Sequence, residues 1–185
     1  MERIDKVVFG DNQFFGINHR SQDKAEELAQ KFSDLKNILD VYDGAFDSGV
    51  TAVMLNSNQK AMEITDYFRS HKDKYGEIAW YPSIPYPHKY ADMVNELGIF
   101  PAIKEAIFSN NSTIGVLGML AKGATIAVNK DPLKVMEMLI DVEYKIFKDL
   151  NVKVLFLQNV VTDLLLGMNL KDVFIHYCEY IKKKY

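Results

Sequence analysis

Five short runs of the chain are almost continuously apolar and rich in β-branched and aromatic side chains. Alternating patterns are typical of strands with one face in water, whereas continuous runs are typical of strands covered on both faces. We therefore predict five buried strands, at Lys6–Phe9, Thr51–Leu55, Glu77–Tyr81, Thr113–Gly118 and Val152–Leu157.

The segments between these runs have the three- and four-residue spacing of amphipathic helices. One such series, which contains a possible new N-cap at Ser33 and Asp34, comprises Leu28, Phe32, Leu35, Leu39, Tyr42 and Phe46. It predicts a short helix over about 22–31 and a longer one over about 35–48. Further helices are predicted after Asn58, over His88–Leu97, from Pro101, from Asp131-Pro132 and over Leu170–Lys183.

Alternation of strand and helix predicts a parallel sheet with right-handed crossovers, in a single α/β domain over residues 1–185. The segment 112–120 contains two glycines and fits either a strand or a helix. A strand there keeps the spacing between strands regular, so we favour it.

Polar clusters follow several of the predicted strands, as expected of strand ends that meet on one face of a barrel. The glycine motif of dinucleotide-binding sheets is absent, because five residues separate Gly10 from Gly16 and no glycine lies between them. We therefore predict a parallel (β/α)-barrel-type fold with about five β/α units. A complete barrel needs about 250 residues. The chain is then the N-terminal part of a longer barrel, or it associates with a second copy as a homo-oligomer.

The segment Ala45–Val50 and the strand through Leu55 resemble the second unit of the aldo-keto reductase barrel. The resemblance implies a barrel and, as one alternative, an NAD(P)-linked oxidoreductase. Asn56 stands where that family has its catalytic aspartate, and the family's tyrosine has no counterpart here. Asparagine cannot accept a proton, so we use the resemblance for the fold alone.

The stretch after the first strand, FGDNQFFGINHR, has an unusual density of polar groups for a connection. Asp11 is a candidate general base, and His19 and His88 are candidate proton shuttles. Each also has a structural interpretation: Asp11 as a turn residue, His19 as a surface residue and His88 as a helix start.

Residues that would orient a substrate are predicted at several strand ends. The loop Tyr81–His88 contains three prolines and is preset to an extended geometry. A stiff packed connector is the alternative for this loop. The predicted substrate-binding residues are Asn12, Gln13, Arg20, Asn56, Asn58, Tyr81, Ser83, Tyr86, Gln158 and Asn159.

Composition narrows the possible classes of protein. Apolar residues make up 48% and charged residues 25%, which excludes a disordered chain. A net charge of −3 argues against nucleic acid as a partner. No apolar run is long enough to span a membrane, and the one cysteine, Cys178, fits a reducing, cytoplasmic compartment.

We predict no metal site, because the chain lacks His-x-x-x-His and paired cysteines. No cofactor can be named. The preferred function is an enzyme acting on a small polar metabolite at the carboxyl ends of the strands, of lyase, isomerase or oxidoreductase class. The alternative is a non-catalytic binding or scaffold protein that assembles through an incomplete barrel.

Overall fold

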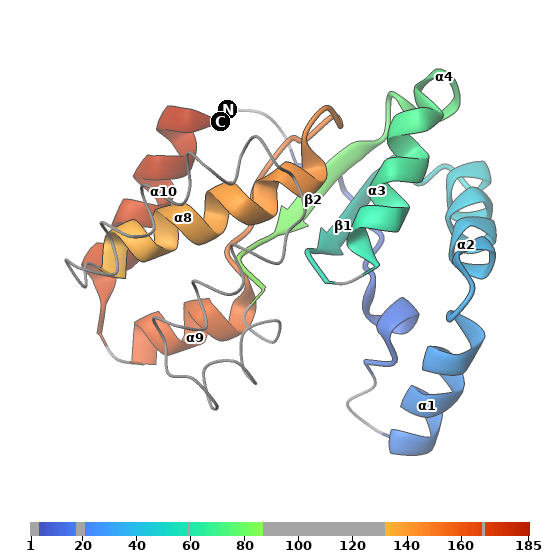
Figure 1. Ribbon diagram of the computed structural model, residues 1–185, viewed down its shortest axis with the longest axis horizontal. Coiled ribbons are helices and arrows are strands. Elements are labelled where there is room, and N and C mark those ends of the chain that lie inside the picture. The colour runs from blue at the N-terminus through green and yellow to red at the C-terminus, as the bar shows by residue number, and fades with distance from the viewer. Residues whose placement is uncertain (1–3, 18–20, 59, 87–131, 168) are drawn as a thin grey trace. The chain divides into compact units, whose positions relative to one another are not determined.

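A computed structural model describes residues 4–17, 21–58, 60–86, 132–167 and 169–185 (Figure 1). The chain forms two compact units. The first unit comprises Met1–Ser83 and Ile146–Phe156, and the second unit comprises Ile84–Lys145 and Leu157–Tyr185.

The first unit combines a small sheet with helices that follow and connect its strands. Its elements are η1 (Asn12–Phe15), α1 (Gln22–Lys31), α2 (Leu35–Asp47), β1 (Ala52–Asn56), α3 (Ala61–Ser70), α4 (Lys72–Tyr75) and β2 (Ala79–Ser83). The strands β1 and β2 are parallel, with Val53 opposite Trp80 and Asn56 opposite Ser83.

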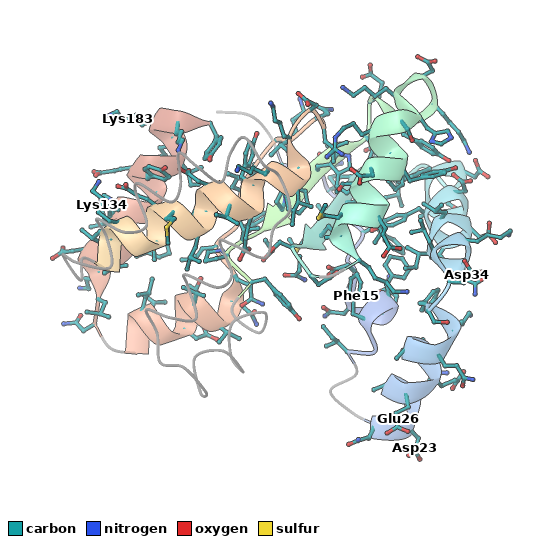
Figure 2. All side chains as sticks on the ribbon, viewed as in Figure 1. Phe15, Asp23, Glu26, Asp34, Lys134 and Lys183 are labelled. Carbon is teal, nitrogen blue, oxygen red and sulfur yellow. The ribbon has the colours of Figure 1, made fainter. Side chains whose placement is uncertain are left out.

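The predicted starts of α1 and α2 are confirmed, and local capping explains them. The hydroxyl of Ser21 accepts a hydrogen bond from the Lys24 amide at 3.2 Å. The carboxylate of Asp34, which Figure 2 labels, accepts one from the Lys36 amide at 2.9 Å. These bonds satisfy backbone donors that have no partner within the helix. After α2 the chain turns at Gly49, whose φ of 89° is unfavourable for any residue with a Cβ.

The prediction of a parallel (β/α)-barrel-type fold with about five β/α units is wrong. Across the described residues the only sheet has two strands, and it is accompanied by seven α-helices. The predicted strands Lys6–Phe9 and Val152–Leu157 form only isolated parallel bridges, at Phe9 to Val53, Trp80 to Val152 and Ser83 to Phe156. The fourth predicted strand, Thr113–Gly118, lies outside the described residues, as do the helices predicted over His88–Leu97 and from Pro101.

The two segments have different numbers of residues between their shared bridges, which explains why Val152–Phe156 does not continue the sheet. The bridges join Trp80 to Val152 and Ser83 to Phe156, so three steps along β2 correspond to four steps along the other segment. One extra residue interrupts a ladder as a β-bulge does. On the other side of the sheet, Phe9 alone pairs with β1, through Phe9 N to Ala52 O at 2.9 Å and Met54 N to Phe9 O at 2.8 Å.

Aromatic side chains form most of the core between the helices and the sheet of the first unit. Phe68 of α3 lies at the centre, with its ring 5.4 Å from Tyr42, 4.8 Å from Tyr75 and 5.2 Å from Trp80. Edge-to-face contacts of this kind add to the free energy gained from burial. They fix α2, α3 and α4 against one face of the sheet.

The second unit is helical in its described part. Its elements are α8 (Pro132–Tyr144), α9 (Asn159–Gly167) and α10 (Lys171–Lys184), and η2 (Lys145–Phe147) lies where the chain passes from the second unit to the first. The helices predicted from Asp131-Pro132 and over Leu170–Lys183 are thereby confirmed. No helix within the described ranges is long and apolar enough to cross a membrane.

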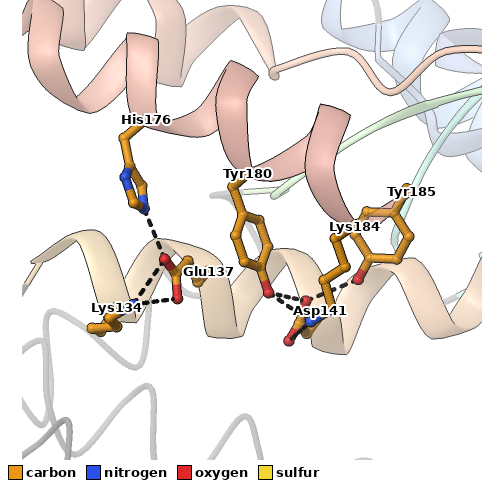
Figure 3. A network of polar contacts seen from close by, with 7 residues as sticks. All are labelled: Lys134, Glu137, Asp141, His176, Tyr180, Lys184 and Tyr185. Atoms are coloured by element: carbon orange, nitrogen blue, oxygen red, sulfur yellow. Dashed lines mark hydrogen bonds and ion pairs between the residues drawn. The ribbon is translucent and has the colours of Figure 1, made fainter.

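Polar contacts join α8 to α10 in the second unit (Figure 3). The imidazole of His176 lies 2.8 Å from a Glu137 oxygen, and the Tyr180 hydroxyl donates to Asp141 at 2.6 Å. The acceptors are four residues apart on α8 and the donors four apart on α10, so each pair repeats at one helical turn. Lys184 and Tyr185 also contact Asp141.

Candidate functional site

Asp11 lies in the turn between the Phe9 bridge and η1, at the carboxyl end of the sheet. It occupies the N-cap position of η1, but its side chain makes no capping hydrogen bond. Instead, the carboxylate accepts a 2.7 Å hydrogen bond from the main-chain amide of Asn56, the last residue of β1. The Asn56 side-chain amide donates to both Asp11 oxygens at 3.0 Å. Asp11 therefore joins two segments that are 45 residues apart in the sequence.

The Asp11 carboxyl is almost entirely removed from solvent, with 3% of its surface exposed. Burial raises its pKa above the ordinary value of 3.8, because an ionised carboxylate loses its hydration. The hydrogen bonds from Asn56 lower the pKa and only partly offset the effect of burial. The result is a fixed carboxyl that holds a proton more strongly than an ordinary aspartate does.

Other buried polar side chains lie at the same end of the strands. Asn56 and Ser83 are opposite each other in the register of β1 and β2, and they are 9% and 8% exposed. Ser57, directly after β1, is fully buried. Parallel strands bring such groups together at their carboxyl ends, which is where open α/β sheets bind ligands. The structure thus brings together three of the predicted site residues: Asp11, Asn56 and Ser83.

Three other predicted site residues of the first unit make hydrogen bonds within that unit, Gln13 and Asn58 to nearby residues and Tyr81 to a distant one. The Gln13 amide donates to the Gly10 carbonyl at 2.8 Å, and the Asn58 oxygen accepts from the amides of Lys60 and Ala61 at the start of α3. The Tyr81 hydroxyl donates to Asp5 at 2.5 Å. These bonds give each side chain a structural role. Asn12 is exposed.

Three predicted site residues belong to the second unit. The Gln158 oxygen accepts a 2.9 Å hydrogen bond from the Val160 amide at the start of α9, and Asn159 is the exposed first residue of that helix. The amide of Tyr86 donates to Glu143 at 2.8 Å. The remaining predicted residues, His19, Arg20 and His88, lie outside the described residues.

Glu143 and Tyr42 are among the buried polar side chains that were not predicted from the sequence, although the sequence carried a signal for Glu143. Glu143 is fully buried in α8. It falls four residues after Leu139 on the apolar side of the predicted helix, where a carboxylate is unusual. Tyr42 has a fully buried side chain, and its place in the apolar series of α2 gave no sign that its hydroxyl matters.

A surface pocket of about 480 Å³ lies at the opposite, amino end of the strands in the first unit. It is lined by Phe68, Lys72, Tyr75, Gly76, Glu77, Trp80, Asp149, Leu150, Asn151 and Lys153. The charged residues among these are exposed and of both signs. The pocket therefore lacks a buried carboxyl like that of Asp11 among its described lining residues. The described residues also contain no cluster of side chains suited to hold a metal ion.

Comparisons of the chain with protein family models, with curated proteins and with solved structures found no match.

The raised pKa of Asp11 predicts a specific dependence of stability on pH. A carboxyl whose pKa is higher in the folded chain stabilises the fold fully below its unfolded pKa of 3.8. This contribution is lost as the pH rises through the raised folded pKa. We expect the wild-type chain to lose stability relative to Asp11→Asn across this window, as measured by urea unfolding of both chains at several pH values. The raised pKa of Asp11 would be contradicted if the difference in free energy of unfolding between the two chains stayed constant with pH. It would also be contradicted if that difference grew in favour of the wild type as the pH rises.

Proposed function

We propose that the first unit binds a small polar metabolite at the carboxyl ends of its strands and that Asp11 transfers a proton there. The observation that supports this most strongly is the buried Asp11 carboxyl, fixed by Asn56, whose pKa is raised by burial. Ionisable groups with perturbed pKa values at a strand end are typical of catalytic sites. Of the three candidates for proton transfer, Asp11, His19 and His88, only Asp11 lies within the described residues, so the geometric support concerns Asp11 alone.

The chemistry that fits such a carboxyl is removal of a proton from a carbon next to a carbonyl group. The carbon–hydrogen bond breaks, the proton moves to an Asp11 oxygen, and the electron pair passes to the carbonyl oxygen. A base with a raised pKa is better matched to this step than an ordinary aspartate. We assign the role of donor toward the carbonyl oxygen to the hydroxyl of Ser83, which lies opposite Asn56 in the register of the sheet.

This reaction class is preferred to nicotinamide-linked reduction. A dinucleotide requires a phosphate-binding turn, and the turn after Phe9 lacks the glycine spacing that such a site uses. An isomerase or lyase needs only the acid–base group and donors at the carbonyl. We place this activity in the cytoplasm, for which the single cysteine of the sequence is the support.

Exchange of hydrogen with solvent tests the proposal without knowledge of the full reaction. The chain is incubated in D₂O with a panel of keto acids, hydroxy ketones and sugar phosphates, and proton NMR follows the signal of the carbon-bound hydrogen next to each carbonyl. We expect at least one compound to exchange faster with the protein than without it. If no compound exchanges faster, the proposed proton transfer is wrong.

A further inference from the structure

Tyr42 lies in the middle of α2 and is fully buried. Its ring contacts four phenylalanine rings, at centroid distances of 5.1 Å for Phe14, 5.4 Å for Phe68, 5.8 Å for Phe9 and 5.9 Å for Phe46. A phenylalanine at position 42 would pack against these rings equally well. The hydroxyl therefore needs an explanation that packing does not supply.

The Tyr42 hydroxyl is fully buried and has no hydrogen-bond partner among the described residues. A buried polar group without a partner costs free energy, because it gives up its bond to water and gains nothing in return. The four rings packed on Tyr42 carry no charged or polar atoms. None of these rings can therefore accept a conventional hydrogen bond from the hydroxyl.

Asp11 is a buried carboxyl in the segment that connects two of these rings, Phe9 and Phe14. Phe9 and Phe14, which contact the tyrosine ring, lie on either side of Asp11 in the sequence, and Phe14 N donates to Asp11 O at 2.9 Å. Burial and, after it, the negative charge of Asp11 raise the pKa of Tyr42. A hydroxyl donor and a carboxylate acceptor thus lie in one buried region without a direct hydrogen bond between them.

We infer that one buried water joins the Tyr42 hydroxyl to the Asp11 carboxyl, which makes Tyr42 a positioning residue for the proton-transfer group. A buried water requires at least two polar partners, and these two groups provide them. The water would satisfy the hydroxyl and would give Asp11 a donor in addition to Asn56. The catalytic meaning of this contact rests on the proposed function, whereas the contact itself does not.

Replacement of Tyr42 by phenylalanine distinguishes a hydrogen-bonded hydroxyl from one without a partner. Loss of a bonded hydroxyl lowers the melting temperature, whereas loss of an unbonded one leaves it unchanged or raises it. We expect Tyr42→Phe to lower the melting temperature by about 2–4 °C. We also expect it to move the titration midpoint of the Asp11 carboxyl upward in carbon-13 NMR, because the charged form loses a donor. An unchanged or higher melting temperature, or an unchanged Asp11 midpoint, would overturn the inference.

Tyr75→Phe is the matched control, since the Tyr75 hydroxyl donates to Asp43 at 2.6 Å. It should lower the melting temperature and leave the Asp11 midpoint unchanged. A double-mutant cycle with Tyr42→Phe and Asp11→Asn measures the coupling directly, and additive effects would overturn the inference. A shifted Asp11 midpoint in a chain that catalyses no exchange would support the Tyr42 contact and contradict only the proposed function.

Discussion

Asp11→Asn is expected to reduce protein-catalysed hydrogen exchange by about 100-fold or more, the lower range of what a general base contributes. Asparagine has almost the same shape as aspartate but cannot accept the proton. The fold should persist, because the Asn56 side-chain amide can rotate to present its oxygen to the new amide group. The Asn56 main-chain bond to residue 11 can also remain, since it needs only an oxygen acceptor.

Asp34→Asn is the control for the loss of one negative charge. Asp34 caps α2 from an exposed position, and asparagine caps helices about as well as aspartate. We expect this variant to exchange hydrogen at the wild-type rate. If Asp11→Asn keeps its circular dichroism spectrum and also keeps the wild-type rate, Asp11 is not the base.

Phe68→Ala is expected to reduce the free energy of unfolding by about 3–5 kcal/mol. Phe68 is 2% exposed and packs against Tyr42, Phe46, Tyr67, Tyr75 and Trp80, so its removal leaves a cavity that these rings cannot fill. A loss of this size is a large share of the stability of an ordinary domain. Urea unfolding followed by the fluorescence of Trp80, the single tryptophan, measures it.

Phe15→Ala is the matched control for this change. Phe15, labelled in Figure 2, is half-buried, and its ring centroid lies 6.4 Å from that of Phe14. Phe15→Ala should reduce the free energy of unfolding by less than half as much as Phe68→Ala, because less apolar surface is lost from the core. Equal losses for the two variants would contradict the central place of Phe68.

The sequence predicted the local structure of the first unit well. The starts of α1 and α2 depend on single side chains, Ser21 and Asp34, that bond to amides two or three residues away. Apolar periodicity within one helix is likewise visible in a short window. Such features need no knowledge of distant residues.

The extent of the sheet could not be predicted in the same way. Val152–Leu157 has the composition of a strand. Between the two bridges, however, it contains one residue more than β2 does. Composition gives no information on register, which depends on segments far apart in the chain. Counting apolar runs therefore overestimated the sheet and suggested a barrel.

The sequence indicated where Asp11 and Asn56 lie, but not how they interact. Asp11 and Asn56 were each placed at a strand end, yet their mutual hydrogen bonds depend on the pairing of Phe9 with β1. The environment of the Tyr42 hydroxyl depends on packing that periodicity cannot show. Periodicity identifies which side of a helix is buried and does not identify the atoms that lie opposite it.

The titration of the Asp11 carboxyl, followed by carbon-13 NMR in the wild-type chain, tests the central claim most directly. A buried carboxyl fixed at the end of the strands should show a midpoint above the ordinary 3.8. A midpoint at or below 3.8 would show that the hydrogen bonds from Asn56 outweigh burial, and Asp11 would then be a structural carboxylate and not a base.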